Sequence, residues 1–185
     1  MKIRKFSKPF KHVLIENFLS KKDAKILLKE LKKEKFELKE SDLFNFKQTQ
    51  ELHFSKNKAI LNFYKFFSGR EFGKHIEEMM GIKLNGKIDM AGSLYERTDF
   101  LLPHDDRLEG RKVAYIYYLN ELSKKDGGDL AFFSSKKGKP GKIVKRFFPK
   151  ENSLILFEVS KNSWHAVEEV LASKKRYSFT GWFHR

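Results

Sequence analysis

The chain has 185 residues, 40% of them hydrophobic and 15% aromatic, with 39 Lys and Arg against 24 Asp and Glu. This length and apolar content predict a single domain, residues 1–185, with one sizeable core. The absence of cysteine excludes disulfides, zinc–thiolate sites and iron–sulfur clusters, so any metal must be bound by His, Asp or Glu. No apolar run approaches the roughly 20 residues of a membrane span, which predicts a soluble, cytoplasmic protein without a membrane partner.

The formal net charge of +15 is the second broad feature of the composition. Such an excess of positive charge favours contact with polyanions such as RNA or anionic surfaces. The alternative is that the lysines, which are scattered along helical faces and turns, form only a solvated surface. The sequence leaves both interpretations open.

Two helical regions are expected in the first part of the chain, over residues 20–80. Apolar residues recur at helical spacing between Lys21 and Lys35, directly after Ser20, whose side chain suits an N-cap. The second region runs from about Asn57 to Met80 and has a break near Gly69. We expect these helices to support a sheet from outside.

From about residue 83 to residue 185 the pattern changes to short runs rich in Val, Ile, Phe and Tyr, separated by turn residues. Regularly spaced strands with tight, glycine-containing turns predict a sandwich or a double-sheet jelly roll, with the early helices packed outside. The fold class is therefore mainly β with N-terminal helices (α+β). The strands are expected near Lys87–Tyr95, Lys112–Leu119, Asp129–Phe133, Lys142–Phe148, Ser153–Glu158, Trp164–Glu169 and Arg176–Phe183.

An imidazole and a carboxylate two residues apart, His104 and Asp106, lie just after a predicted strand. Residues i and i+2 of an extended chain point to the same side, so both can bind one metal while Asp105 turns away. His165, at the start of a later predicted strand, supplies a third ligand. Two imidazoles and one carboxylate on one face of an octahedral ion leave three positions open, the arrangement of non-haem Fe(II) oxygenases. The other histidines lack partners at ligand spacing and are expected to be structural or exposed: His12, His53, His75 and His184.

Arg176 and Ser178 follow on the last predicted strand, again with i, i+2 spacing. A guanidinium and a hydroxyl that face the same way can bind a carboxylate. A dicarboxylate such as 2-oxoglutarate requires this pair, because one of its ends chelates iron and the other needs a cationic partner. A His-x-Asp tripeptide, a lone histidine and a lone arginine each arise easily without function. The prediction depends on their order and spacing together.

Four segments together carry a resemblance to a known family: Val13–Ser20, Leu102–Arg111, Phe157–Ser160 and Ser178–His184. The chain resembles the 2-oxoglutarate- and Fe(II)-dependent dioxygenase superfamily and, within it, the prolyl 4-hydroxylase-like branch. It is most similar to the catalytic domain of the eukaryotic ribosomal prolyl hydroxylases, which modify a proline in the decoding-centre protein of the small ribosomal subunit.

This resemblance implies a double-stranded β-helix and a prolyl hydroxylase activity that consumes 2-oxoglutarate and O2, with ascorbate as a stimulant. It implies Fe(II) bound by His104, Asp106 and His165, and the far carboxylate of 2-oxoglutarate held by Arg176. Tyr95 matches a tyrosine that helps to bind the same carboxylate, and Ser178 is assigned to it as well. The eukaryotic enzymes continue into a second, non-catalytic jelly-roll domain, whereas this sequence stops at residue 185, so substrate recognition by that domain is not carried over.

The sequence favours hydroxylation of a protein, with a ribosomal protein as the candidate that the resemblance indicates, over two other functions. A nucleic-acid demethylase of the same superfamily would suit the positive charge, but its last strand resembles Arg-x-Asn-x-Thr-x-Arg. Here Ser178 stands in place of the Asn and Trp182 in place of the second Arg. A metal-free jelly-roll binding module would have no use for the four residues His104, Asp106, His165 and Arg176 together.

Overall fold

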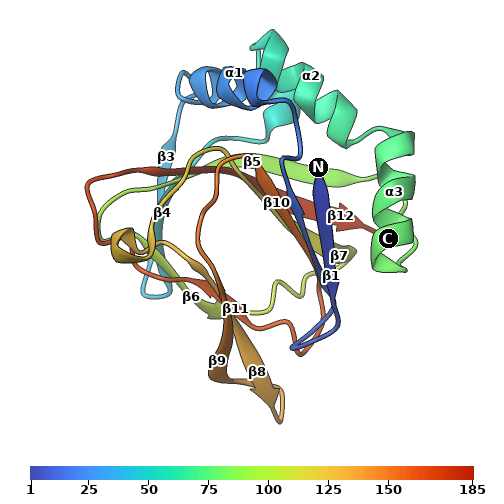
Figure 1. Cartoon of the computed structure of the whole chain (residues 1–185), viewed down its shortest axis with the longest axis vertical. Helices are drawn as coiled ribbons and strands as arrows, with labels where there is room; N and C mark the ends of the chain where they lie inside the picture. The colour runs from blue at the N-terminus through green and yellow to red at the C-terminus, as the bar shows by residue number, and fades with distance from the viewer.

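Twelve strands, all in antiparallel pairs, make one continuous hydrogen-bonded sheet, and the computed structural model describes all 185 residues. The sheet is curled, so that its two halves form facing walls (Figure 1). A short strand, β3 (Glu37–Ser41), pairs only with β4. The order of the other strands is β1 (Lys2–Phe6), β2 (His12–Glu16), β10 (Ser153–Glu158), β7 (Arg111–Tyr118), β12 (Arg176–His184), β5 (Ile88–Tyr95), β4 (Phe44–Gln48), β6 (Phe100–His104), β11 (His165–Val167), β8 (Leu130–Lys136) and β9 (Lys139–Phe147).

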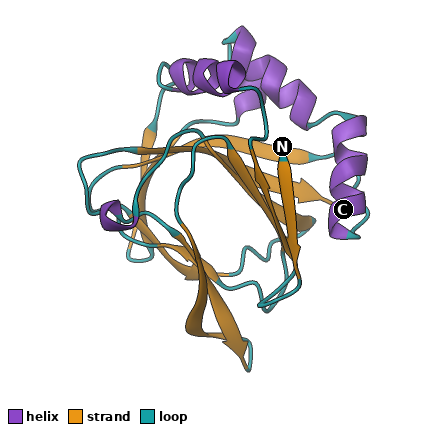
Figure 2. Ribbon diagram, in the orientation of Figure 1, coloured by secondary structure: helices purple, strands orange, loops and turns teal.

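Three α-helices lie along the outside of one wall (Figure 2). They are α1 (Lys21–Leu31), α2 (Lys58–Phe67) and α3 (Arg70–Met80), and two single-turn helices, η1 (Leu52–Phe54) and η2 (Lys124–Asp126), lie in connections. The predicted N-cap is present, because the hydroxyl of Ser20 accepts a hydrogen bond from the backbone N–H of Asp23. The predicted break near Gly69 is also present, between α2 and α3. None of the helices is long and apolar enough to cross a membrane.

The main hydrophobic core lies between these helices and the wall formed by β2, β10, β7, β12 and β5. Phe63 and Phe67 of α2 stack there on aromatic side chains of the sheet, such as Phe179 and Phe183 of β12. Alternation along β12 then sends Arg176, Ser178, Thr180 and Trp182 to the opposite face, inside the curl of the sheet. The helices thus fix one face of the wall, and the other face is available for a site.

The predicted fold class is confirmed: the chain is mainly β with N-terminal helices, and its curled antiparallel sheet is a double-stranded β-helix. Several boundaries were wrong. The first helix ends at Leu31, not Lys35, and the strand expected over Trp164–Glu169 has only three residues, His165–Val167. Five strands were not predicted: β1, β2, β3, β4 and β6.

Candidate active site

Three candidate ligands from two neighbouring strands meet inside the curled sheet. His104 is the last residue of β6, Asp106 lies two residues beyond it, and His165 is the first residue of β11. In the antiparallel pair of β6 and β11, His104 lies directly opposite His165, and the ring centroids are 4.1 Å apart. One potential ligand atom from each of the three residues lies within 4.8 Å of the other two. The pairing of β6 with β11 therefore joins segments that are far apart in the sequence.

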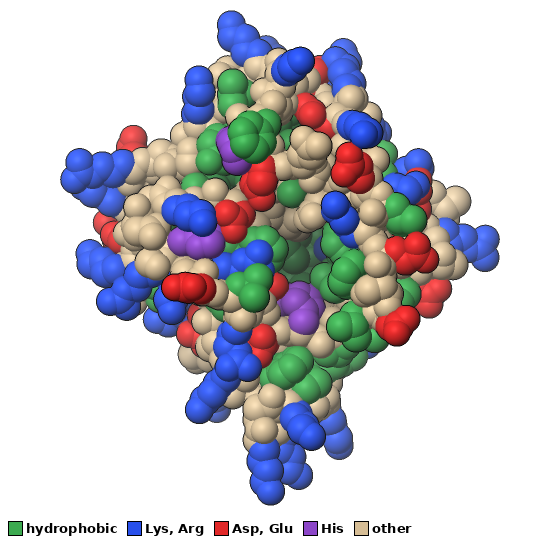
Figure 3. All heavy atoms as spheres, turned by 180° about the vertical axis from the view of Figure 1, so that it is seen from behind, with side chains coloured by type: hydrophobic (Ala, Val, Ile, Leu, Met, Phe, Trp, Pro, Cys, Tyr) green, Lys and Arg blue, Asp and Glu red, His purple; other side chains and the backbone are tan.

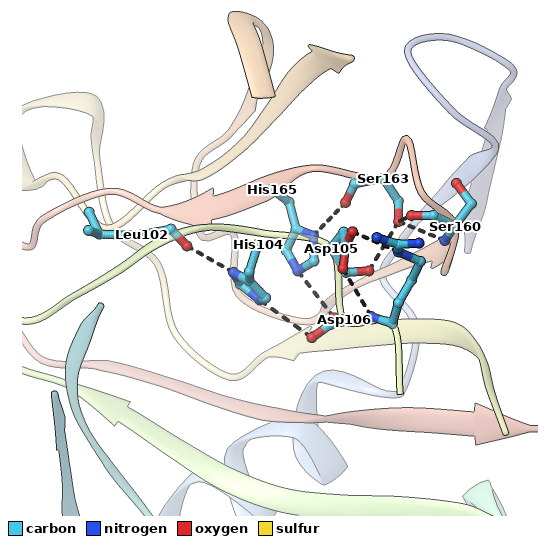
Figure 4. A network of polar contacts seen from close by, with 8 residues as sticks. Leu102, His104, Asp105, Asp106, Ser160, Ser163 and His165 are labelled. Atoms are coloured by element: carbon cyan, nitrogen blue, oxygen red, sulfur yellow. Dashed lines mark hydrogen bonds and ion pairs between the residues drawn. The ribbon is translucent and has the colours of Figure 1, made fainter. Parts of the chain in front are cut away.

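Backbone carbonyls orient both imidazoles, as Figure 4 shows. Nδ1 of His104 lies 2.9 Å from the carbonyl oxygen of Leu102, and Nδ1 of His165 lies 2.8 Å from that of Ser163. Because a carbonyl oxygen only accepts, each Nδ1 donates its proton, and in the neutral imidazole the lone pair is then on Nε2. The two Nε2 atoms face Asp106, at 3.4 Å from Oδ1 for His104 and 3.2 Å from Oδ2 for His165. Histidines that bind metals in proteins commonly have this support.

Asp106 reaches the imidazoles through a backbone turn. Their i, i+2 spacing predicts that His104 and Asp106 lie on one side of an extended strand, but β6 ends at His104 and Asp106 has a φ of 61°. That left-handed conformation is one that Asp tolerates better than most residues. The two side chains converge as expected, although the expected cause is wrong. Asp105 turns away and accepts a hydrogen bond of 2.8 Å from Nε of Arg107.

The three groups change one another's affinity for protons. Burial by itself raises the pKa of the Asp106 carboxyl, but the imidazoles of His165 and His104 hold that pKa well below its ordinary value. Burial lowers the pKa of His104, yet its contact with Asp106 outweighs this, so that the pKa is raised. Burial and the neighbouring His104 lower the pKa of His165. An ionised carboxylate beside a neutral His165 suits a divalent metal, which needs deprotonated ligands.

Arg176 is a fully buried guanidinium that forms no ion pair with any carboxylate of the chain. Its hydrogen bonds are long, at 3.4 Å from Nη1 to Oγ of Ser178 and 3.3 Å from Nη2 to Oη of Tyr118, and its Nε has no partner. A buried cation without a counter-ion destabilises the folded protein by on the order of several kcal/mol, unless an anion binds to it. The side chain therefore fits the carboxylate of a ligand, which a guanidinium can bind through two parallel hydrogen bonds.

Two tyrosines enclose this guanidinium, whose carbon lies 4.8 Å from the ring centroid of Tyr95 and 4.9 Å from that of Tyr118. Tyr95 lies opposite Arg176 in the pairing of β5 with β12. Burial raises the pKa of both phenols, so both stay protonated and the hydroxyl of Tyr95 can donate to an anion. Ser178 does not line the cavity beside them, since its buried hydroxyl lies against Arg176.

Tyr118 was missed by the sequence analysis, although a signal for it exists. It lies on β7 directly opposite Ser178 of β12, and this pairing brings its hydroxyl to Arg176. Alternation along a predicted strand over residues 112–119 places Tyr117 and Tyr118 on opposite faces. Which of the two faces the site depends on the pairing of β7 with β12, and a single sequence does not reveal that pairing.

One cavity inside the curl contains the three candidate ligands and Arg176. It encloses about 530 Å³ of empty space, part of which is open to solvent. In Figure 3 it is the hollow at the centre of the face, with hydrophobic side chains and a histidine at its edge. Tyr95 also lines it, and much of the remaining wall is apolar: Leu101, Ala114, Ile116, Leu130, Phe157 and Val167.

A stacked pair that the sequence analysis did not identify borders this cavity. The guanidinium carbon of Arg111 lies 3.4 Å from the centroid of the Trp182 ring, and Trp182 lines the cavity. Nε1 of Trp182 is buried without a hydrogen-bond partner. A guanidinium held over an indole by a cation–π contact still has N–H groups that can donate to a substrate.

The other four histidines take no part in this site, as expected. His12 and His184 are buried and bonded, to the carbonyl of Phe10 and the carboxylate of Asp89 respectively. His53 and His75 are more exposed and lie near glutamates. The chain contains no second cluster of three potential metal ligands.

The residues present fit the cofactors that the resemblance implies. Two imidazoles and one carboxylate converge from one side, and this set suits Fe(II) with open positions for other ligands. The orphaned guanidinium of Arg176 lies in the same cavity and suits the far end of a dicarboxylate.

Comparisons with known proteins agree with this geometry. Residues 90–184 match the family model of the 2OG-Fe(II) oxygenase superfamily. The chain is 40% identical to prolyl 3-hydroxylase OGFOD1 of Xenopus laevis, over 96% of this chain and 35% of that protein. It therefore spans about a third of the length of this curated relative.

Solved prolyl hydroxylases share the fold. A prolyl 4-hydroxylase of Pseudomonas putida superposes with a TM-score of 0.78 at 21% identity, covering 94% of this chain and 92% of the other. A prolyl hydroxylase of Trichoplax adhaerens, in complex with a peptide of hypoxia inducible factor, gives 0.76 at 18% identity, covering 94% and 83%. The resemblance to prolyl hydroxylases is confirmed, and the chain belongs to the 2OG-Fe(II) oxygenase superfamily.

Proposed function

We propose that the chain is a dioxygenase in which His104, Asp106 and His165 bind Fe(II), while Arg176 and Tyr95 bind the far carboxylate of 2-oxoglutarate. The observation that carries this proposal is the buried, unpaired guanidinium of Arg176, which shares one cavity with three converged metal ligands. A dicarboxylate that reaches from one group to the other satisfies both. Ser178 contributes by positioning Arg176 from behind.

Bound Fe(II), with 2-oxoglutarate and O2 as co-substrates, supplies the oxidation of an unactivated C–H bond in this superfamily. The side chains of this protein bind and orient. The carbonyls of Leu102 and Ser163 hold the two imidazoles in the tautomer that directs Nε2 to the metal. The apolar wall excludes water, and Tyr95 stays protonated as a hydrogen-bond donor to the co-substrate.

The substrate that we propose is a prolyl residue of a protein. The OGFOD1 relative is named a prolyl 3-hydroxylase, which favours attack at C3 of the ring. The Trichoplax enzyme was solved with a peptide, and a peptide is a suitable ligand for the rim where Arg111 stacks on Trp182. A ribosomal protein is the candidate that the sequence resemblance indicates, and the charge of +15 supports an encounter next to ribosomal RNA.

The unbroken strand path from β1 to β9 supports a single domain over residues 1–185. The nucleic-acid demethylase stays behind the prolyl hydroxylase, because Trp182 stands where those enzymes have a second Arg on the last strand.

The test uses the purified chain with Fe(II), 2-oxoglutarate and ascorbate. Two substrates are compared at low and high salt: the isolated decoding-centre protein and small-subunit particles. We expect the mass of one oxygen atom to be added to one proline, faster on particles and suppressed by salt. An unmodified protein in both forms, together with efficient 2-oxoglutarate turnover on alkylated nucleic acid, would replace this function by demethylation.

A further inference from the structure

The β8–β9 hairpin extends away from the rest of the chain, at the end of the molecule opposite α1 (Figure 1). Its tip, residues 136–142, carries four exposed lysines that form no ion pair: Lys136, Lys137, Lys139 and Lys142. No acidic residue occurs between Asp129 and Glu151 in the sequence. The tip is therefore a compact region of uncompensated positive charge.

Two further basic residues of the hairpin are already engaged, which sets the tip lysines apart. Arg146 bonds to the carboxylates of Asp129 and Glu168. Lys145 lies 3.0 Å from Nε2 of His12 and 3.1 Å from the centroid of the Phe6 ring. These two residues attach β9 to the body of the protein. The side chains of the four tip lysines form no hydrogen bond or ion pair with the rest of the chain.

Two features of the tip destabilise the hairpin and contribute nothing to the fold. Lys136 and Lys139 lie directly opposite each other, and like charges in such a pair destabilise a hairpin. Lys137 adopts a φ of 51° beside Gly138, a position that a short polar residue or Gly would occupy with less strain. Lysines on a sheet edge can prevent aggregation, and at the tip both strands are free on their outer sides, because β11 pairs with β8 only over Leu130–Phe132. Edge protection does not require a lysine at the turn position Lys137, nor two lysines directly opposite each other.

The hairpin is continuous with the candidate active site. Phe132 of β8 lies opposite His165, and Lys136 comes four residues later on the same strand. At about 3.3 Å per residue, the tip is about 13 Å along the strand from the metal-ligand position. A macromolecule held by the tip would lie near the mouth of the cavity.

We propose that this hairpin tip binds the phosphate backbone of a nucleic acid. Lysines without a fixed hydrogen-bonding frame recognise charge density rather than sequence, which fits a phosphate polymer. A peptide that added to the free edge of β9 would be held by backbone hydrogen bonds, which need no lysines at the extremity, whereas a phosphate polymer needs the concentrated charge. A membrane surface would favour apolar side chains at the extremity, where the tip has only Pro140 between its lysines. The proposal deepens the partner part of the proposed function, but its test does not depend on catalysis.

Binding of a fluorescein-labelled single-stranded RNA, and separately of duplex DNA, is measured by anisotropy over about 50 to 200 mM salt. In the hairpin variant, Lys136, Lys137, Lys139 and Lys142 are changed to Gln. In the matched variant, four exposed lysines of α1 are changed to Gln: Lys21, Lys22, Lys25 and Lys29. Both variants lose the same charge, and thermal melting confirms that both fold.

The hairpin variant should bind RNA at least tenfold more weakly, with a salt slope less negative by roughly 3, as expected for four lost phosphate contacts to a single strand. The α1 variant should change affinity less than threefold. Equal weakening in both variants would reduce the effect to net charge and overturn the proposal. So would hairpin-dependent binding of poly-glutamate in place of RNA, which would assign the surface to an acidic protein. If the unmutated chain showed no 2-oxoglutarate turnover but did bind RNA through the hairpin, only the proposed function would be contradicted.

Discussion

His104 and His165 face each other across the antiparallel pair of β6 and β11, with their ring centroids 4.1 Å apart. Each ring is held by a backbone carbonyl two residues before it, from Leu102 and Ser163. The candidate site is thus built on a strand pair, and the third ligand, Asp106, joins through the turn that ends β6. Ligands on paired strands are held more rigidly than ligands on separate loops.

Changing His165 to Ala should remove metal binding, because the remaining pair, His104 and Asp106, provides only two ligands. Titration calorimetry with Mn(II) measures this directly, and we expect at least a hundredfold loss of affinity. His75→Ala is the matched control, since His75 is exposed on α3. Wild-type affinity in His165→Ala would show that the metal binds elsewhere.

Changing Arg176 to Met should have opposite effects on co-substrate binding and on stability. The 2-oxoglutarate concentration for half-maximal turnover should rise about a hundredfold or more, since losing one side of a buried charge pair costs about 3–5 kcal/mol. Without 2-oxoglutarate, the variant should resist urea better than the wild type, by about 1–4 kcal/mol, because an uncompensated buried cation has been removed.

Mn(II) affinity should stay unchanged in the same variant, and Arg70→Met, at an exposed position of α3, is the control. A wild-type requirement for 2-oxoglutarate in Arg176→Met would move the carboxylate anchor to another residue.

Gly181 on β12 should not tolerate a side chain. A Cβ added there would lie 1.9 Å from the carbonyl oxygen of Asp89 and 2.8 Å from Oη of Tyr115. Gly181→Ala should therefore destabilise the protein by about 3 kcal/mol through overpacking. Gly73→Ala is the contrast, since nothing lies within 4 Å of its added Cβ, and a helix gains roughly 0.5–1 kcal/mol from this change. Urea unfolding measures both, and similar effects at the two positions would contradict the packing of β12 against β5.

His12 should make stability depend on pH. Burial, with a smaller contribution from the ammonium of Lys145, lowers the pKa of His12 from 6.5 to about 4. Between these values the unfolded chain binds more protons than the folded one, so stability should fall as the pH drops from 6.5 to 4, by about 2 kcal/mol. His12→Gln, which keeps one donor and one acceptor, should remove this part of the dependence in urea unfolding. The same slope in wild type and variant would show that His12 titrates normally.

Much of the fold could be predicted, because the core strands β7, β10 and β12 are dense in large apolar and aromatic residues. Some of the missed strands lack this signal. β1 is an edge strand with three basic residues among its five, and β3 pairs only with β4. The strand β6 contains Pro103 and follows a turn, so its sequence is typical of a loop. The stability of these elements comes from their neighbours in the sheet, and a local pattern does not contain that information.

Of the six predicted site residues, five line one cavity, and Ser178 lies behind Arg176. His104, Asp106 and His165 share one cavity with Tyr95 and Arg176, although the turn at Asp106 was not foreseen. Tyr118, Arg111 and Trp182 were missed as members of the site. They reach it through the strand order β7-β12-β5, which a single sequence does not specify.

The proposed site holds Fe(II) at one end of a single cavity and the far carboxylate of 2-oxoglutarate at Arg176. A crystal structure with Mn(II) and 2-oxoglutarate, using anomalous scattering from the metal, tests this most directly. We predict a single metal peak bound by Nε2 of His104, Nε2 of His165 and the carboxylate of Asp106, with the far carboxylate of the co-substrate on the guanidinium of Arg176. A metal peak away from these three residues, or a co-substrate that leaves Arg176 unpaired, would contradict the account.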